Sequence, residues 1–216
     1  MVDWWHTFDF PEFKTQGKDN SPEKLKFLGI PENLSGKRVL DIGCWDGYFS
    51  FVCEKRGASV LAIDSPKFAW GEELWDGELG SYRKHSGKLG FETAHKALNS
   101  KVFSKEMEII DIRDGEFELV LCLGILYHMK NPFDILEKVF KVTTEGGMCI
   151  IETHTDGNYL AAPAMIYYPA HSLNNDPCNY WGPNLSCLFA MLRRVGFKDS
   201  KAHAISGNRV VIHAFK

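Results

Sequence analysis

Short apolar runs alternate with amphipathic helical patterns along most of this 216-residue chain. The run from Lys37 to Ile42 is β-branched and aliphatic and ends at a glycine, as buried parallel strands do. The next segment, Tyr48 to Arg56, places its apolar side chains on one helical face and stops before Gly57. This alternation predicts an α/β fold, in which helices cover both faces of a mostly parallel sheet.

Seven strands are expected in that sheet. They lie at residues 37–42, 59–63, 107–112, 117–123, 148–151, 202–205 and 209–215. The last two are joined by the short link Ser206-Gly207-Asn208, which favours an antiparallel hairpin. Helices are expected to begin at Asn131-Pro132 and at Asn184, where a capping side chain precedes an apolar stripe.

Composition narrows the class of protein. With 44% hydrophobic and 25% charged residues, the chain is long enough for one globular domain with its own core. It has no membrane-length apolar run and no signal-peptide pattern at its start, so we expect a cytoplasmic protein without a membrane partner. Its six cysteines form no CxxC pair, which argues against a disulfide framework or a zinc site. A formal net charge of −3 disfavours a surface that attracts nucleic acid everywhere.

The stretch DIGCWDGYFS directly follows the first expected strand, where ligands bind in sheets of this kind. Gly43 and Gly47 allow a sharp turn close to a ligand, but their spacing differs from the GxGxxG loop of dinucleotide-binding proteins. Carboxylates at Asp41 and Asp46 would repel a diphosphate and attract an ammonium group. Asp64, at the end of the second strand, is placed to accept both hydroxyls of a ribose. The pattern predicts a ligand with a cationic end and a ribose.

These residues resemble the motifs of class I S-adenosylmethionine-dependent methyltransferases, over about residues 36 to 216. The motifs are Asp41-x-Gly43-x-x-x-Gly47, Asp64 one βα unit later, Asp111-Ile112 ending the third expected strand and Gly146-Gly147 before the fifth. More narrowly, LSGKRVLDIGCWDGYFS, CLGILYHMKNP, WGPN and MLRRVGF are similar to the branch that includes the tRNA wobble-uridine carboxymethyltransferase and its small relatives. The resemblance implies a Rossmann-like fold, S-adenosyl-L-methionine as cofactor and S-adenosyl-L-homocysteine as product.

The resemblance also implies which residues bind the cofactor. They are Asp41, Gly43, Trp45, Gly47, Asp64, Asp111 and Ile112. Asp41 would lie at the methionine end, Asp64 at the ribose, and Asp111 with Ile112 at the adenine. Trp45 stands where most of the superfamily has a third glycine, and its ring either walls the methionine pocket or packs into an amino-terminal cap.

Catalytic residues are expected after the fourth and fifth strands. Methyl transfer is an in-line displacement, so a base is needed only if the acceptor must lose a proton. Tyr127 and His128 are the expected catalytic residues, and His128 is either the base or a packed loop histidine. Glu152 and His154 either orient an acceptor or belong to a solvated loop, which is the plainer interpretation. No carboxylate ends the fourth strand, so no metal is expected.

Two segments lie outside the minimal fold. Residues 1–35 are expected to form an amino-terminal cap or lid on a cofactor-binding domain of residues 36–216, with Trp5 and His6 lining the substrate. Packing of these aromatic residues on an outer helix is the alternative. Residues 65–106 are expected to form a helical insertion in which Trp70 lines the substrate, and its lysine run is either a phosphate-binding face or a solvated surface.

The predicted function is transfer of a methyl group to an oxygen or nitrogen of a small-molecule acceptor. A tRNA wobble-uridine-modifying (carboxy)methyltransferase is the alternative. The branch resemblance and the lysine run favour it, while the net charge and the short stretch before the first strand disfavour it. A second alternative is a non-catalytic protein that binds S-adenosylmethionine. The sequence indicates neither the acceptor nor an oligomeric state.

Overall fold

The computed structural model describes residues 2–66, 74–75, 82–83, 87–113, 115 and 117–216. These residues belong to two compact units, one containing the described residues up to Asp111 and the other those from Ile112 onward. None of the helices in the described ranges is both long and apolar enough to cross a membrane.

The first unit contains three parallel strands with one helix packed on them. The strands are β3 (Arg38–Ile42), β4 (Ser59–Asp64) and β7 (Phe103–Glu106), in the order β3-β4-β7. Helix α2 (Tyr48–Lys55) contacts β3 and β4, and its apolar face is fully buried. These elements match the expected strand, helix and strand between residues 37 and 63, because each apolar pattern there is bounded by a glycine turn.

The amino-terminal part of this unit is built around aromatic side chains. A hairpin of β1 (Asp9–Phe10) and β2 (Phe13–Lys14) precedes helix α1 (Ser21–Leu28), which starts with a proline in its first turn and ends at Gly29 in the left-handed conformation. The ring of Phe8 contacts those of Trp4, Phe13 and Tyr48 at 5.3–5.4 Å between centroids. These rings pack on one another and, through Phe8, on Tyr48 of α2, and the expected lid function stays a prediction.

The prediction of a third strand at residues 107–112 is wrong. The strand that pairs with β4 is β7, whose four residues are all exposed, and Ile109–Asp111 instead form a 3₁₀ turn, η1. An edge strand pairs on one side only and buries little, so FSKE carries no apolar signal, whereas the run Met107 to Ile112 does. The remaining described elements of this unit are β5 (Leu74–Trp75), β6 (Tyr82–Arg83) and α3 (Gly87–Ala97), and α3 is a helix inside the expected insertion.

The second unit contains four strands in the order β12-β13-β9-β8. They are β8 (Phe117–Leu123), β9 (Thr143–His154), β12 (Asp199–Ser206) and β13 (Arg209–Phe215). β8 and β9 are parallel, whereas β13 is antiparallel to both of its neighbours, as the short link after Ser206 predicts. β9 begins earlier than expected and includes Gly146 and Gly147, because the chain continues directly from the preceding helix into the strand.

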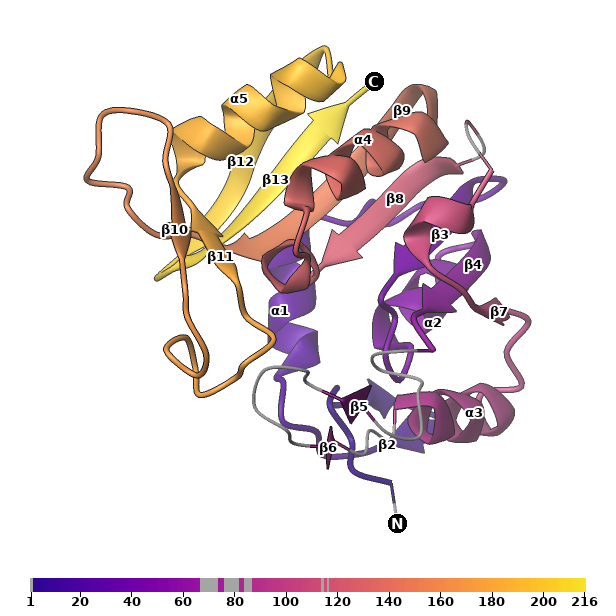
Figure 1. Cartoon of the computed structure of the whole chain (residues 1–216). Helices are drawn as coiled ribbons and strands as arrows, with labels where there is room; N and C mark the ends of the chain where they lie inside the picture. The colour runs from indigo at the N-terminus through magenta and orange to yellow at the C-terminus, as the bar shows by residue number, and fades with distance from the viewer. Residues whose placement is uncertain (1, 67–73, 76–81, 84–86, 114, 116) are drawn as a thin grey trace. The chain divides into compact units, whose positions relative to one another are not determined.

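Two helices lie side by side on one face of these four strands (Figure 1). They are α4 (Pro132–Val142) and α5 (Leu185–Val195). The Asn184 side chain caps α5 by accepting a hydrogen bond from the Cys187 N–H at 2.9 Å, whereas the Asn131 side chain makes no capping bond to α4. Before α5 lie a 3₁₀ turn, η2 (Leu126–His128), and a hairpin of β10 (Met165–Tyr167) and β11 (Trp181–Pro183) that the sequence did not predict.

Candidate active site

Two buried carboxylates lie at the carboxyl ends of β3 and β4. Asp41 is 3% exposed, and one of its oxygens accepts a hydrogen bond from Ser50 Oγ at 2.5 Å. Asp64 is 4% exposed and accepts from the N–H groups of Trp45 and Ser65, both at 2.8 Å. In the described ranges, no cationic side chain forms an ion pair with either carboxylate. Burial accordingly raises the pKa of Asp41 to about 6 and that of Asp64 to about 7.

Asp46 is equally buried, at 1% exposed, but its carboxylate already has partners. It accepts hydrogen bonds from the backbone N–H groups of Trp5 and His6 at 2.9 and 3.0 Å, and its second oxygen contacts His6 Nδ1. The expectation that both aspartates of DIGCWDGYFS attract an ammonium group is thus wrong for Asp46, whereas for Asp41 it stays a prediction. Asp46 instead joins the amino-terminal segment to the glycine loop.

The glycine loop, residues 43–47, does not present its backbone N–H groups as a phosphate-binding loop would. The N–H groups of Gly43 and Cys44 both donate to the carbonyl of Ile63, at 2.9 and 3.1 Å, and that of Gly47 donates to Cys44 at 2.8 Å. The loop needs its positive φ values of 67° at Gly43 and 85° at Gly47. A Cβ at Gly47 would also lie 2.5 Å from the ring of Phe91, so this glycine is required by packing against α3.

The residues present fit S-adenosylmethionine better than a dinucleotide. Each carboxylate oxygen has a second lone pair, so Asp64 retains acceptors for two ribose hydroxyls after binding Trp45 and Ser65. An ammonium group would supply the missing positive charge at Asp41. A diphosphate would find most of the N–H donors of the glycine loop already used, since those of Gly43, Cys44 and Gly47 donate to backbone carbonyls and that of Trp45 donates to Asp64.

The ring of Trp45 lies 5.7 Å from that of Trp5, which places it against the amino-terminal segment. Of the two expected locations for this side chain, packing on the cap is the one for which the structure gives a contact. Trp5 itself remains 43% exposed, while His6 is buried at 7%. Trp70, the other aromatic expected to line the substrate, lies outside the described residues.

The chain segment next to Asp64 is not the one the sequence suggested. The N–H of Met107 donates to the Asp64 carbonyl at 3.1 Å, and Ser65 Oγ donates to Glu108 Oε1 at 2.6 Å. Asp111 is exposed and Ile112 is buried, and neither ends a strand. Their expected role at the adenine stays a prediction, and Glu108 is a neighbour of Asp64 that the sequence motifs did not indicate.

In the second unit, polar side chains gather at the carboxyl ends of β8 and β9. Arg209, the first residue of β13, donates from Nε and from its terminal nitrogen to the two oxygens of Glu152, both at 2.6 Å. Its guanidinium carbon lies 4.8 Å from the centre of the Tyr127 ring. Glu152 is only 4% exposed, so the solvated-loop interpretation of this residue is wrong. Burial alone would lower the pKa of Arg209, and the pair with Glu152 reverses that and raises it.

The two histidines at this edge are held by different partners. His128 Nδ1 lies 2.8 Å from the carbonyl of Cys178, which can only accept, so this nitrogen carries the proton in a neutral ring. His154 is 5% exposed, and its Nε2 lies 3.1 Å from Tyr168 Oη, which in turn donates to Asp156. His154 is therefore not in a solvated loop either.

Arg209, Tyr168 and Asp156 were missed by sequence reasoning. Arg209 carried a detectable signal, since it is a charged residue opening the otherwise apolar run RVVIHAF. Tyr168 and Asp156 lie in the long connection between β9 and α5, where no periodicity marks them.

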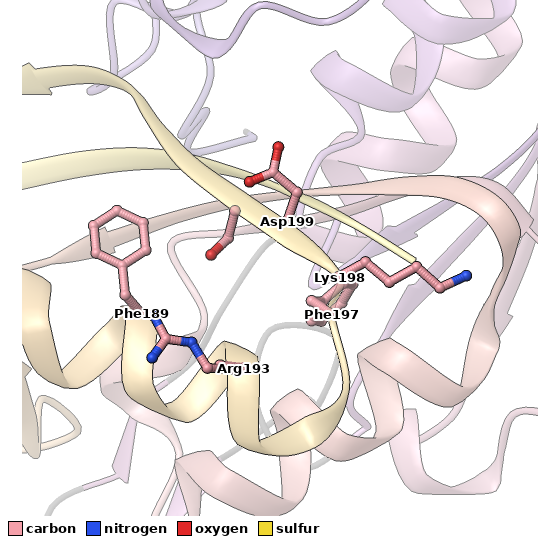
Figure 2. Close-up of a pocket in the computed structure, with 6 residues that line it drawn as sticks. Phe189, Arg193, Phe197, Lys198 and Asp199 are labelled. Atoms are coloured by element: carbon pink, nitrogen blue, oxygen red, sulfur yellow. The ribbon is translucent and has the colours of Figure 1, made fainter.

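A separate pocket in this unit opens at the opposite end of the strands (Figure 2). It is lined by Phe189, Arg193, Phe197, Lys198, Asp199 and Ser200. Asp199 pairs with Phe215 at the end of β13, whereas Arg209 begins β13. The pocket therefore lies a full strand length from Glu152 and His154 and is not part of the candidate site.

Comparisons with known proteins bear on the fold and the family of this chain. A ubiquinone biosynthesis O-methyltransferase of Pseudomonas fluorescens is 27% identical over 150 residues, which cover 69% of this chain and 57% of that protein. The crystal structure of the N-terminal domain of EvdMO1, in the presence of SAH and D-fucose, superposes with a TM-score of 0.69 at 17% identity, covering 98% of this chain and 91% of that one. An S-adenosylmethionine-dependent methyltransferase of Mesorhizobium loti gives 0.58 at 14% identity, covering 90% and 96%.

These likenesses confirm the predicted fold class, since the seven mostly parallel strands and their helices match the Rossmann-like fold of class I methyltransferases. The chain spans little more than half the length of the curated relatives that it matches. The match to the methyltransferase domain family extends from residue 14 to residue 201, and the chain therefore belongs to that family.

Proposed function

We propose that this chain is an S-adenosylmethionine-dependent methyltransferase that methylates an oxygen or nitrogen of a small-molecule acceptor. The observation that carries the proposal is the pair of buried carboxylates, Asp41 and Asp64, which have no ion-pair partner in the described part of the chain. One suits an ammonium group and the other a ribose diol. S-adenosylmethionine carries both groups and supplies an activated methyl group when bound.

The residues of each unit have distinct tasks in this proposal. Asp41, Asp64 and the backbone of the glycine loop hold the cofactor, and Trp45 packs against Trp5 of the amino-terminal segment. The second unit supplies the candidate groups for the acceptor, Tyr127, His128, Glu152 and His154, and a histidine takes up a proton where the acceptor must lose one. An oxygen acceptor is favoured because the curated relatives are O-methyltransferases.

The wobble-uridine alternative has less support. Lys88, one of the lysines of the basic run, forms an ion pair with Glu106, and Lys84 lies outside the described residues. The family match and the ubiquinone biosynthesis O-methyltransferases agree on methyl transfer but do not point to that branch. A cytoplasmic location, a lid function for residues 1–35 and a catalytic role for His128 and Tyr127 stay predictions.

Isothermal titration calorimetry with S-adenosylhomocysteine tests the cofactor assignment. Asp64→Ala should weaken binding by at least roughly 100-fold, because two hydrogen bonds to a charged acceptor are lost, each contributing about 1.5–3 kcal/mol. Asp134→Ala, an exposed carboxylate in the first turn of α4, is the matched control and should bind normally. Unchanged affinity in the Asp64 variant would remove this residue from the site.

A further inference from the structure

A hydrogen-bonded chain of three side chains lies at the end of β9. Asp156 accepts from Tyr168 Oη, and that oxygen lies 3.1 Å from His154 Nε2. Tyr168 has a single hydroxyl proton, which it gives to the carboxylate, so its oxygen accepts from His154. His154 Nε2 must therefore carry a proton, and in the neutral ring Nδ1 carries the lone pair. None of the described residues forms a hydrogen bond with Nδ1.

The surroundings of His154, Tyr168 and Asp156 set the protonation states that these hydrogen bonds need at neutral pH. Burial lowers the pKa of His154 below 6.5, and the nearby Arg209 lowers it further, so the ring is neutral. Burial, together with the bond to Asp156, raises the pKa of Tyr168, so its hydroxyl keeps the proton. The hydrogen bond from Tyr168 lowers the pKa of Asp156, which stays a carboxylate.

The local fold leaves room for Tyr168 to contact Asp156. Tyr168 directly follows β10, and Asp156 follows β9, so the two come from separate segments. A Cβ on Gly182 of β11 would lie 2.9 Å from the Tyr168 ring and 3.1 Å from Asp156 Cβ. The glycine in the motif WGPN is thus needed so that Tyr168 can reach Asp156, which gives the motif a structural reason.

Resting on the proposed function, we infer that His154 is the residue that accepts the acceptor's proton and that Tyr168 and Asp156 position it. Tyr168 orients the His154 ring and is itself oriented by the Asp156 carboxylate, and this is the arrangement of an activated general base. When an acceptor hydroxyl reacts, its O–H bond breaks and the proton moves to His154 Nδ1. The oxygen's electron pair forms the bond to the methyl carbon, and the methyl–sulfur bond breaks with its pair left on sulfur.

His128 is less suited to the same step. Its Nδ1 is bonded to the backbone carbonyl of Cys178, which orients the ring but contributes no net negative charge to stabilise an imidazolium. His154 is linked through Tyr168 to the carboxylate of Asp156, whose negative charge stabilises an imidazolium. The positive charge of Arg209 opposes this effect, but Arg209 is already paired with Glu152. Tyr168 thus contacts His154 directly, and the charged groups that act on the ring are Arg209, Asp156 and Glu152.

Nuclear magnetic resonance of the full chain with ¹⁵N-labelled histidine tests the geometry without any reaction. The wild-type spectrum should show His154 as the Nε2–H tautomer at pH 7, titrating below 6.5. Tyr168→Phe should give mixed tautomers and a lower pKa, because the oxygen that stabilises the charged ring is gone. Tyr159→Phe, which alters an 84% exposed tyrosine in the same connection, should change nothing. An Nδ1–H tautomer in the wild type would overturn the inference.

Transfer of label from radioactive S-adenosylmethionine into a small-molecule cell extract tests the role. His154→Gln should lower the rate by roughly 100-fold or more, the range of general base catalysis. His128→Asn should lower it less and keep the wild-type pH profile. In Tyr168→Phe the rate should fall and the acidic limb of the profile should move to lower pH. His171→Gln, an exposed histidine, is the control.

The outcomes separate the two proposals. If His154→Gln transfers label at the wild-type rate, His154 is not the base, although the enzyme is a methyltransferase. If the wild type transfers no label to any small molecule, the proposed function fails, and the base assignment fails with it.

Discussion

At the scale of single residues, the proposed cofactor site buries two carboxyl groups at a cost to the stability of the folded chain. Asp41 and Asp64 have folded-state pKa values of about 6 and about 7, above their ordinary value of 3.8, with burial as the main cause. Each carboxyl group therefore holds its proton more tightly in the folded chain than in the unfolded one. Ligand-binding groups of this kind are stabilised by the ligand rather than by the protein.

The pH dependence of stability follows with a definite sign. Below about pH 4 the two carboxyl groups are protonated in both the folded and the unfolded chain, so they do not make the free energy of unfolding depend on pH. Between about pH 4 and pH 7 the unfolded chain ionises first, and the free energy of unfolding falls as pH rises, by a total on the order of a few kcal/mol. Asp64→Asn should flatten this slope, as measured by urea unfolding without ligand from pH 4.5 to 8. An equally steep slope in the variant would mean that Asp64 ionises normally.

At the scale of elements, the glycine loop, the amino-terminal segment and α3 meet at one side chain. Asp46 accepts from Trp5 and His6, and a Cβ on Gly90 of α3 would lie 2.8 Å from Asp46 Cβ. A Cβ on Gly17 would lie 2.3 Å from the carbonyl carbon of His6, so the segment closes on itself only with glycine there. The position of the amino-terminal segment therefore depends on the conformation of the glycine loop.

Limited trypsin digestion tests this dependence. Asp46→Ala leaves two backbone N–H groups and the His6 ring without their acceptor, at about 1–3 kcal/mol for each buried group. Cleavage after Lys14 and Lys18 should then become at least several-fold faster, while cleavage in the second unit stays unchanged. The matched control is Asp3→Ala, which removes an exposed ion pair with Lys18. Equal cleavage in the Asp46 variant and the wild type would show that this carboxylate does not hold the segment.

At the scale of the whole molecule, a ligand that binds only the folded chain raises its melting temperature by mass action. S-adenosylhomocysteine at 100 times its dissociation constant should add about 2.7 kcal/mol of stability. For a chain of 216 residues this corresponds to roughly 5–10 °C, measurable by scanning calorimetry. NAD and bulk tRNA at physiological salt should produce no shift. A shift with NAD alone would contradict the cofactor proposal, and a salt-sensitive shift with tRNA would revive the RNA alternative.

Local sequence determined the elements with strong periodicity and the loop chemistry between them. The strand and helix from Arg38 to Lys55, the aspartate that ends β4, and the capped helix after Asn184 all follow from short-range patterns, because burial on one face and turn geometry leave a local signature. Tertiary structure decided what those residues contact. It paired an all-exposed strand, β7, with β4, assigned Asp46 to the amino-terminal segment rather than to a ligand, and brought Asp156 and Tyr168 to His154. Edge pairing and contacts between distant segments leave no periodic trace in the sequence, because each depends on residues far apart along the chain.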